Sequence, residues 1–410
     1  MKKYLETDVL IVGRGMVGAT TAIALARAGF NSIIIDQVKP SDQNIKTYDG
    51  RASAIASASK KMLEQLDIWD RLGKNYTPIF DIRVSDQSSK HFLHYERHVL
   101  DSKPLGFMVE NRHFRYAVNT ELESLEPITT ISNVKIETIR RNNEGVFAAL
   151  TNQQTIKSSL IVGADGRQSQ VRTDASIALT RFDYKQTGIV LTVEHEHDHN
   201  NIAHEHFYSG GPFAILPMKN ESGKNIRSSI VWIDKTEQIL KILKLPDKQF
   251  NSILNQKFGD FLGRIIVVSS KWTYPLSFQF ADKCIDERLV LVGDASHGLH
   301  PIAGQGFNMG LRDVAALVEV ITNNARLGLD IGGYATLREY ETWRRFDNTS
   351  MLLFTDTLNR LFSNNILPLK VIRQLGLSIT NNLGPLKKYL MLYAMGEVGD
   401  LPKLLKGQSL

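Results

Sequence analysis

The stretch TDVLIVGRGMVGATTAIALARAGFNSIIID, residues 7–36, decides the fold class of this chain. An apolar strand leads into the turn GRGMVG at residues 13–18, an alanine-rich helix follows, and a second apolar strand ends at Asp36. This order predicts a βαβ unit. Its glycines permit a tight bend, close approach of a pyrophosphate and close packing of helix on strand, and the helix N-terminus stabilises phosphate charge. The stretch therefore predicts a dinucleotide site, FAD or NAD, with contacts from Gly13, Gly15, Met16, Val17, Gly18 and Asp36.

The composition is that of an ordinary globular protein. The chain has 410 residues, of which 42% are hydrophobic and 22% charged, so two or three domains and a large core are expected. Disordered, collagen-like and fibrous classes are excluded. The single cysteine, Cys284, permits no internal disulfide and no thiolate metal site, which favours a reducing, cytoplasmic compartment. We expect Cys284 to be a buried or half-buried packing residue.

Two further glycine-rich segments follow apolar strands. GADGRQSQVR at residues 163–172 places Asp165 at a sharp turn, where it can bind sugar hydroxyls or order a phosphate loop, and Arg172 is a candidate to orient it. A generic Asp-Gly turn explains this segment equally well. GDASHGLHPIAGQGFNMGLRD at residues 293–313 runs from a strand through a loop into a helix predicted over 305–324. Its glycines expose N–H groups at the positive helix end, which can stabilise negative charge on a flat ligand, and Asp294 suits a ribityl hydroxyl.

Together, in this order, the three segments resemble the flavoprotein aromatic hydroxylases, the single-component FAD monooxygenases. The run HPIAGQGFNMGLRD at 300–313 is more specific and resembles the signature of the ubiquinone-biosynthesis hydroxylases. The resemblance covers nearly the whole chain and is strongest at 8–36, 160–172 and 288–317. The departures are small: Arg14 replaces a usual glycine, Asp36 stands where Glu is common, and Ser296 replaces a usual Ala.

The resemblance implies a flavin site drawn from all three segments and from two positions between them. Besides the βαβ residues, the implied FAD contacts are Arg51, Asn111, Arg112, Gly163, Asp165, Gly166, Gly293, Asp294, Pro301, Gly304, Gly306, Phe307 and Asn308. The implied catalytic residues are Pro301, Gly304, Gln305 and Gly306, with Pro301 shaping the face where oxygen reacts and the backbone after it stabilising charge on the flavin.

The implied reaction is hydroxylation of an electron-rich aromatic ring. NADH or NADPH reduces FAD, O2 is captured as a flavin C4a-hydroperoxide, and the ring of a polyprenyl phenol or quinone precursor is hydroxylated. The sequence does not distinguish NADH from NADPH as the reductant, because it shows no second nucleotide-binding motif. No residue can be named as a base for a phenolic proton. For His297 and His300 we expect a structural role, capping or packing, ahead of a catalytic one.

The predicted fold is α/β: a Rossmann-like FAD-binding domain of the glutathione-reductase and aromatic-hydroxylase type, with an inserted β-sheet substrate domain and C-terminal helices. Within it, 52–66 is expected to be helical. The FAD-binding domain is expected at 1–75, 111–180 and 281–365, the substrate domain at 76–110 and 181–280, and a helical tail at 366–410.

The tail suggests a membrane surface. Residues 366–410 hold six basic and two acidic side chains, out of a net charge of +6 for the chain. Leu369, Ile372, Leu375 and Ile379 share a helical face, as expected of an amphipathic helix with basic edges. A helical pair packed on the FAD-binding domain is an equal alternative. No apolar run reaches the ~18 residues needed to cross a bilayer. We expect a cytoplasmic protein, peripheral on the inner face of the membrane, that binds no nucleic acid.

Histidines cluster at residues 194–206, where strand alternation would put His195, His197 and His199 on one face. Such a face could hold a divalent metal, but we favour a solvated hairpin and predict no metal site.

Three functions remain open. The leading one is a quinone-precursor hydroxylase. The second is a flavin hydroxylase of a soluble aromatic acid, which predicts a small polar pocket with an arginine clamp. The third is a flavin-binding, non-catalytic member of a quinone-biosynthesis complex.

Overall fold

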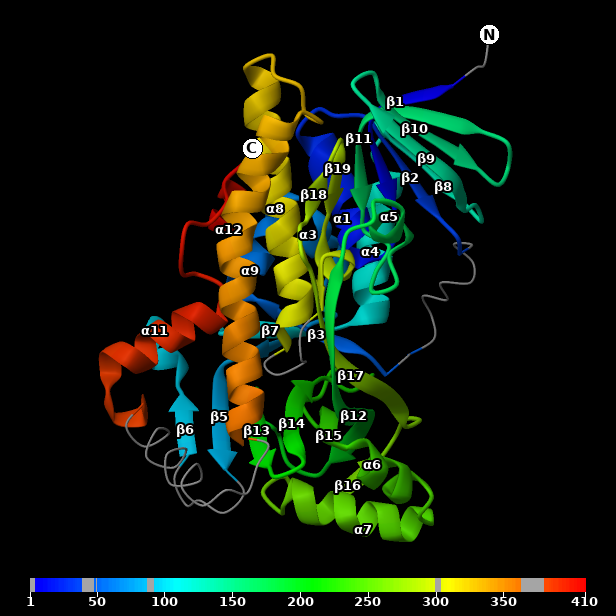
Figure 1. Ribbon diagram of the computed structural model, residues 1–410. Helices are drawn as coiled ribbons and strands as arrows, with labels where there is room; N and C mark the ends of the chain where they lie inside the picture. The colour runs from blue at the N-terminus through cyan, green and yellow to red at the C-terminus, as the bar shows by residue number, and fades with distance from the viewer. Residues whose placement is uncertain (1–3, 39–47, 49, 87–91, 299–303, 363–379) are drawn as a thin grey trace.

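The computed structural model describes residues 4–38, 48, 50–86, 92–298, 304–362 and 380–410, and within them an eight-stranded sheet forms the upper half of the molecule (Figure 1). Its strands run in the order β18-β19-β11-β1-β2-β8, and β10 and β9 continue from β11. The pairs β19–β11, β11–β1, β1–β2 and β2–β8 are parallel. The strands are β1 (Leu5–Val12), β2 (Ser32–Asp36), β8 (Ile128–Ser132), β9 (Ile136–Asn142), β10 (Gly145–Leu150), β11 (Thr155–Gly163), β18 (Ile285–Asp286) and β19 (Leu289–Leu291).

Strand β1 is buried on both faces. Val9 and Ile11 belong to one core cluster, which also holds side chains of α1 (Met16–Arg27) and α8 (Gln305–Arg326). Leu10 and Val12 belong to a second cluster, which is covered by the β9–β10 hairpin and α5 (Gln170–Asp174). A strand enclosed on both faces needs an uninterrupted apolar run, which is why VLIV at 9–12 shows no alternation.

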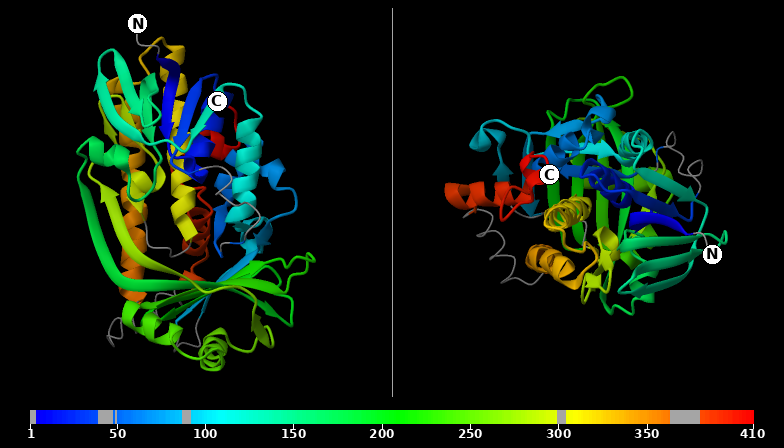
Figure 2. Two further views of the ribbon diagram at one scale, coloured as in Figure 1. Left: turned by 90° about the vertical axis from the view of Figure 1, so that its right-hand side faces the viewer. Right: turned by 90° about the horizontal axis from the view of Figure 1, so that it is seen from above.

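A second sheet, with nine strands in the described part of the chain, lies below the first (Figure 1). Its order is β20-β17-β12-β15-β14-β13-β5-β6, and β16 pairs with β12. The long strands β12 and β17 descend from beside the first sheet and curve into the second, as Figure 2 shows from the side. The strands are β5 (Asp81–Asp86), β6 (Phe92–Tyr95), β12 (Leu179–His195), β13 (Ile202–Tyr208), β14 (Gly211–Met218), β15 (Arg227–Lys235), β16 (Ile265–Val267), β17 (Trp272–Ala281) and β20 (His297–Gly298).

Alternation along the second sheet separates its two faces. On β14, Phe213 and Ile215 pack into a core cluster with Phe250 of α7 (Asp247–Phe258), which lies with α6 (Thr236–Leu243) beneath the sheet (Figure 1). Their neighbours Ala214 and Leu216 point to the opposite face and line a cavity. One face of the sheet therefore packs into a core, and the other face lines the cavity.

The remaining elements connect the two sheets. In Figure 1 the helix α9 runs along most of the molecule beside α8 and reaches the second sheet. In the tail, Met391 of α11 packs on Leu100 and Leu105, whereas Leu404 of α12 joins the core of the first sheet. No helix among the described residues is both long and apolar enough to cross a bilayer. These elements are β3 (Ala52–Ala56), α2 (Ser57–Gln65), α3 (Ile68–Leu72), β4 (Thr77–Ile79), η2 (Arg97–Leu100), β7 (Gly106–Glu110), α4 (Asn111–Glu123), η3 (Gly293–Ala295), α9 (Tyr334–Phe362), α11 (Gly384–Ala394) and α12 (Lys403–Lys406).

The expectation of a helix over 52–66 is wrong for its first five residues. Ala52–Ala56 form strand β3, which pairs antiparallel with β7 in a small sheet that also contains β4. Helix begins at Ser57. Alanine and isoleucine at helical spacing do not exclude a strand. Here these residues are extended because they pair with strand β7, which lies 50 or more residues further along the sequence.

The expectation of a solvated histidine hairpin is wrong for His195 and His199, which are buried, whereas His197 is exposed. Strand β12 ends at His195, so His197 and His199 do not continue its face. His195 and His199 are buried, and their ring nitrogens donate to the carbonyls of His197 and Met218. In the described part of the chain, no group of three or more His, Cys, Asp or Glu residues could hold a metal ion.

Cys284 is buried in the core of the first sheet, as expected.

Close packing at the glycine turn gives a direct test of the fold. A Cβ at Gly18 would lie 1.9 Å from the carbonyl oxygen of Gly13, whereas a Cβ at Gly15 would have no protein atom within 4 Å. Gly18→Ala should therefore destabilise the cofactor-free protein by about 3 kcal/mol in urea denaturation, because helix and strand must separate. Gly15→Ala should stay within about 0.5 kcal/mol of the wild type. Equal losses for the two variants would contradict this packing.

Candidate functional site

The three glycine-rich segments meet at the carboxyl ends of β1, β11 and β19. The backbone N–H of Ala164 donates to the carbonyl of Val12 at 2.9 Å, and the N–H of Val292 donates to that of Gly163 at 3.0 Å. Gly310 of α8 closes the group, since a Cβ there would lie 2.8 Å from the side chain of Val17. Ligands of open α/β sheets bind at this edge, so the expected residues of all three segments face one region.

The turn at 13–18 is shaped for an anion. Gly13 has φ +101°, and a Cβ there would lie 2.5 Å from the carbonyl oxygen of Ala164, so only glycine fits. Helix α1 begins at Met16 without a side-chain cap at Gly15, which leaves its first N–H groups available. The open space around Gly15 lies beside those donors. The cradle fits the pyrophosphate of a dinucleotide.

Asp36 is held in place by backbone donors. Its two carboxylate oxygens accept from the N–H of Arg14 at 2.6 Å and the N–H of Val38 at 2.8 Å. A carboxylate accepts up to about four hydrogen bonds, so lone pairs remain for ribose hydroxyls. The side chain of Arg14, at the position of a usual glycine, turns away to pair with Glu123 at 3.0 Å. The departure at residue 14 therefore ties the turn to α4.

Asp165 is oriented by helix α5. Its Oδ2 accepts from the backbone N–H groups of Gln170 and Val171 at 2.7 and 3.1 Å, while Oδ1 is buried without a hydrogen-bond partner in the described structure. Arg172 does not orient this acid, contrary to expectation, because it donates to the carbonyls of Ala295 and Arg167. The unpartnered oxygen of Asp165 fits a further polar contact at the cofactor edge.

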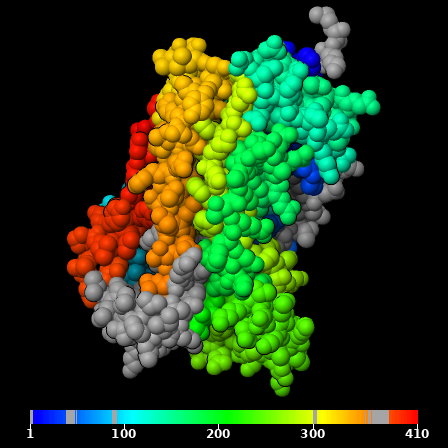
Figure 3. All heavy atoms as spheres, in the orientation of Figure 1, coloured from blue at the N-terminus to red at the C-terminus, as the bar shows by residue number. Residues whose placement is uncertain are grey.

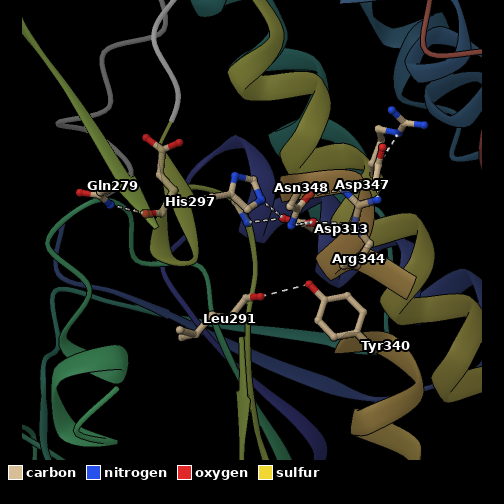
Figure 4. A network of polar contacts seen from close by, with 11 residues as sticks. Gln279, Leu291, His297, Asp313, Tyr340, Arg344, Asp347 and Asn348 are labelled. Carbon is tan, nitrogen blue, oxygen red and sulfur yellow. Dashed lines mark hydrogen bonds and ion pairs between the residues drawn. The ribbon is translucent and has the colours of Figure 1, made fainter. Parts of the chain in front are cut away.

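The segment at 293–297 is fixed by one buried carboxylate, Asp313 of α8 (Figure 4). Its Oδ2 accepts from the N–H of Gly293 at 2.9 Å and from Nε2 of His297 at 2.6 Å. Its Oδ1 accepts from Nε of Arg344, on α9, at 2.8 Å. His297 therefore has the structural role expected of it; His300 lies outside the described residues.

Asp313 stays ionised inside the protein. Burial by itself would raise the pKa of its carboxyl, but the adjacent His297 and Arg344 outweigh burial and hold the pKa below its usual range. For Arg344, burial lowers the pKa, and the charges of Asp313 and Asp347 more than reverse this. Each charge is thus paired with and hydrogen-bonded to its partner, as buried charges must be.

Three more side chains donate hydrogen bonds to backbone carbonyls in this segment or just before it. Tyr340 donates to Leu291 at 3.1 Å, Gln279 to Asp294 at 2.9 Å, and Arg172 to Ala295 at 2.8 Å. The side chain of Asp294, by contrast, is 53% exposed, with Arg167 at 3.6 Å. The backbone is immobilised and the Asp294 carboxylate is presented outward.

The start of α8 is pinned to strand β3. The side chain of Asn308 accepts from the N–H of Ala56 at 2.9 Å and donates to the carbonyl of Ala54 at 2.8 Å. Gly304, the N-cap of this helix, has φ +62° and offers no side-chain cap. Gln305 donates to the carbonyl of Ala394 in α11. Phe307 packs edge-on against Phe114, at 4.9 Å between ring centroids. Pro301 lies outside the described residues.

Arg51, Asn111 and Arg112 lie where β3, β7 and α4 meet. The carbonyl of Arg51 accepts from the N–H of Asn111 at 3.0 Å. Arg112 pairs with Glu110 at 2.6 Å, and Glu110 also pairs with Arg227 of β15 at 3.0 Å. Sequence reasoning missed the Glu110–Arg227 pair and the anchoring role of Asp313, because no local pattern shows that such distant residues meet.

A cavity of about 480 Å³ lies between the second sheet and the helices α8, α9 and α11. Its described lining is mostly aliphatic, and it includes Gly304, Gln305 and Asn308 from the start of α8. The described residues of this lining include no Lys or Arg, and Glu205 is the one acid among them. Its volume is in the range of pockets that enclose a small molecule. The apolar hollow and the polar loop region thus share one wall.

Comparison with known proteins places this site in a family. The sequence matches the FAD binding domain family over residues 6–345. It is 47% identical over 406 residues to the ubiquinone hydroxylase UbiL of Rhodospirillum rubrum, covering 98% of this chain and 93% of that protein. It is 31% identical over 392 residues to the 3-demethoxyubiquinol 3-hydroxylase of Escherichia coli, covering 95% and 98%. The crystal structure of p-nitrophenol 4-monooxygenase PnpA from Pseudomonas putida has a similar fold, with a TM-score of 0.79 and 16% identity, covering 98% of this chain and 100% of that one.

The Asp313 network can be tested by a substitution that keeps side-chain shape. Asp313→Asn removes the buried negative charge shared by His297 and Arg344, leaving Arg344 with Asp347 as its remaining carboxylate, and should cost about 3–5 kcal/mol in urea denaturation. It should also weaken flavin retention, because the single amide oxygen of asparagine cannot accept from Gly293 on one side and from Arg344 on the other. Asp70→Asn, the same change at an exposed side chain of α3, should be neutral. Wild-type stability in Asp313→Asn would show that the network anchors nothing.

Proposed function

Because this chain belongs to the FAD binding domain family, and within it to the ubiquinone hydroxylases, we propose that it hydroxylates the aromatic ring of a polyprenylated ubiquinone precursor. The protein is an FAD-dependent monooxygenase, and the expected family, fold class and flavin cofactor are confirmed. NADH or NADPH supplies the electrons and O2 the oxygen atom.

The proposed cofactor site spans the edge of the first sheet. The N–H groups of α1 would hold the pyrophosphate, Asp36 the ribose, and Asp294 the ribityl chain. The N–H groups at the start of α8, beside Gly304 and Gly306, would stabilise negative charge on the reduced ring system. When bound, FAD supplies the activation of O2. The protein contributes the fixed backbone that holds it.

The apolar cavity is the observation that carries the substrate proposal. A polyprenyl chain needs an aliphatic lining, and the described walls provide one, with side chains such as Ile82, Leu93, Leu216 and Ile233. A soluble aromatic acid would need a cationic partner for its carboxylate, and no Lys or Arg occurs in the described lining. This favours the quinone precursor over the aromatic acid.

We also propose that α11 contacts the membrane surface, where a polyprenylated substrate resides. Leu383, Leu386 and Tyr389, spaced three residues apart, are 49%, 40% and 53% exposed, and Lys388 beside them is exposed too. Figure 3 shows α11 at the surface of the molecule. Its residues Leu390, Tyr393 and Ala394 line the cavity. One helix thus presents apolar and basic side chains to a bilayer on one side and the cavity on the other.

The substrate proposal predicts selective turnover. FAD-loaded protein should oxidise NADH or NADPH faster when a polyprenylated phenol in detergent is added, and the product should carry one oxygen from labelled O2. Ala214→Phe fills the cavity and should raise the KM for this phenol by at least about tenfold. Ser222→Phe, in an exposed turn, should not. Stimulation by 4-hydroxybenzoate alone would favour the aromatic-acid function. Bound FAD without turnover of any lipid phenol would favour a non-catalytic complex member.

The membrane proposal predicts a loss of vesicle binding. The double variant Leu386→Glu, Tyr389→Glu removes two apolar contacts and adds negative charge, so binding to anionic phospholipid vesicles should fall by more than about tenfold in a flotation assay. Tyr334→Glu is a matched control, because Tyr334 is 70% exposed and starts α9 about 25 Å from its cavity-lining residues. Equal flotation of all three proteins would refute the assignment of α11.

A further inference from the structure

We propose that Glu205 is the residue that receives the ring hydroxyl of the substrate and accepts its proton. The proposal rests on the proposed function, because it requires a phenol in the cavity. It names a base that the chain's motifs do not reveal.

Glu205 lies in the middle of an apolar wall. On β13 its pairing neighbours are Val84 of β5 on one side and Ala214 of β14 on the other, and all three residues line the cavity. Along its own strand, Ala203 and Phe207 line the same cavity. A carboxyl group at the centre of such a surface is costly unless a polar ligand meets it. An acid at this position therefore serves a ligand and not the packing of the wall.

The carboxyl group of Glu205 has no hydrogen-bond or ion-pair partner among the described residues, and it faces the hollow that the start of α8 also lines. Other buried carboxylates of this protein are paired, Asp313 with His297 and Arg344, and Glu121 with Arg27. Glu205 is thus a polar group without a partner in an apolar ligand cavity. A phenolic hydroxyl is a donor that fits it, and the rest of the ring and the prenyl chain fit the aliphatic walls.

The other ionisable groups facing the cavity leave Glu205 as the acceptor. Among the described lining residues they are Tyr95 of β6, His204 of β13 and Tyr393 of α11. Burial raises the pKa of Tyr95 to about 12 and also raises that of Tyr393, and burial lowers the pKa of His204 to about 3, so all three are neutral near pH 7. The ring of His204 packs against Phe261, at 4.5 Å between centroids. Burial raises the pKa of Glu205 to about 7, where a general base works best.

The proton transfer balances without another reactant. The phenolic O–H bond breaks, its electron pair stays on the ring oxygen, and the proton goes to a carboxylate oxygen of Glu205. The phenolate donates electron density into the ring and raises its reactivity toward an electrophilic oxygen. After product forms, the carboxylic acid releases the proton to solvent and regains its charge.

Glu205→Gln tests the proposal because it keeps size and hydrogen bonding but cannot take a proton. With a polyprenylated phenol at pH 7, kcat should fall by at least about 100-fold while KM changes by less than about threefold. The variant should retain the flavin absorbance of the wild type. In the wild type, the carboxylate form is the active one, so kcat should rise as pH increases through about 7. This rising limb of the pH profile should be absent in Glu205→Gln. Glu221→Gln, on an exposed turn, is the matched control.

Two further measurements keep the outcome decisive. Glu205→Asp retains a carboxylate and should recover part of kcat together with the pH limb. If Glu205→Gln does not fold, the wild type still decides, because a substrate with its ring hydroxyl methylated has no proton to give and should show no such limb. Unchanged kcat in Glu205→Gln, or an equal pH limb with the methylated substrate, overturns the role of Glu205. If the wild type hydroxylates no prenylated phenol, the proposed function fails instead.

Discussion

The ionised carboxylate of Asp313 is the contact on which the cofactor half of this protein depends. Its two oxygens hold the backbone of Gly293, the ring of His297 and the guanidinium of Arg344, and so tie α8 and α9 to the end of β19. Such a carboxylate is stable in the interior only while these donors stay in place. The donors therefore hold the carboxylate in position, and the carboxylate holds the donors. The Asp294 side chain accordingly extends from a rigid backbone.

The two sheets divide binding between a polar edge and an apolar hollow. The edge of the first sheet offers backbone N–H groups and carboxylates, whereas the second sheet turns its aliphatic face toward α9 and α11. The start of α8 belongs to both, since Gly304 and Asn308 line the hollow while the helix is pinned to β3. In the proposed function, activated oxygen and the aromatic ring would meet at this shared wall with little water present.

Much of the cofactor site is readable in the sequence because its parts are local. The turn at 13–18 and the segment at 293–310 each combine a strand end, glycines and a helix start within a few residues, and Asp36 ends a strand directly. Local reading failed where a distant partner decides. Residues 52–56 pair with β7 instead of starting a helix, and Arg172 reaches Ala295 rather than the nearby Asp165. The buried histidines likewise find acceptors, such as the carbonyl of Met218, that no spacing rule indicates.

The sequence by itself determined that this chain folds around a dinucleotide and belongs with the flavin hydroxylases, because glycine turns and strand–helix order act over short stretches of chain. Only the tertiary structure decided which carboxylate is a buried anchor and which lines a cavity. Asp313 and Glu205 are both acids close to apolar side chains, and they differ in their polar partners. Asp313 meets a histidine and an arginine brought by other elements, whereas Glu205 meets an open cavity formed by strands and helices distant in sequence.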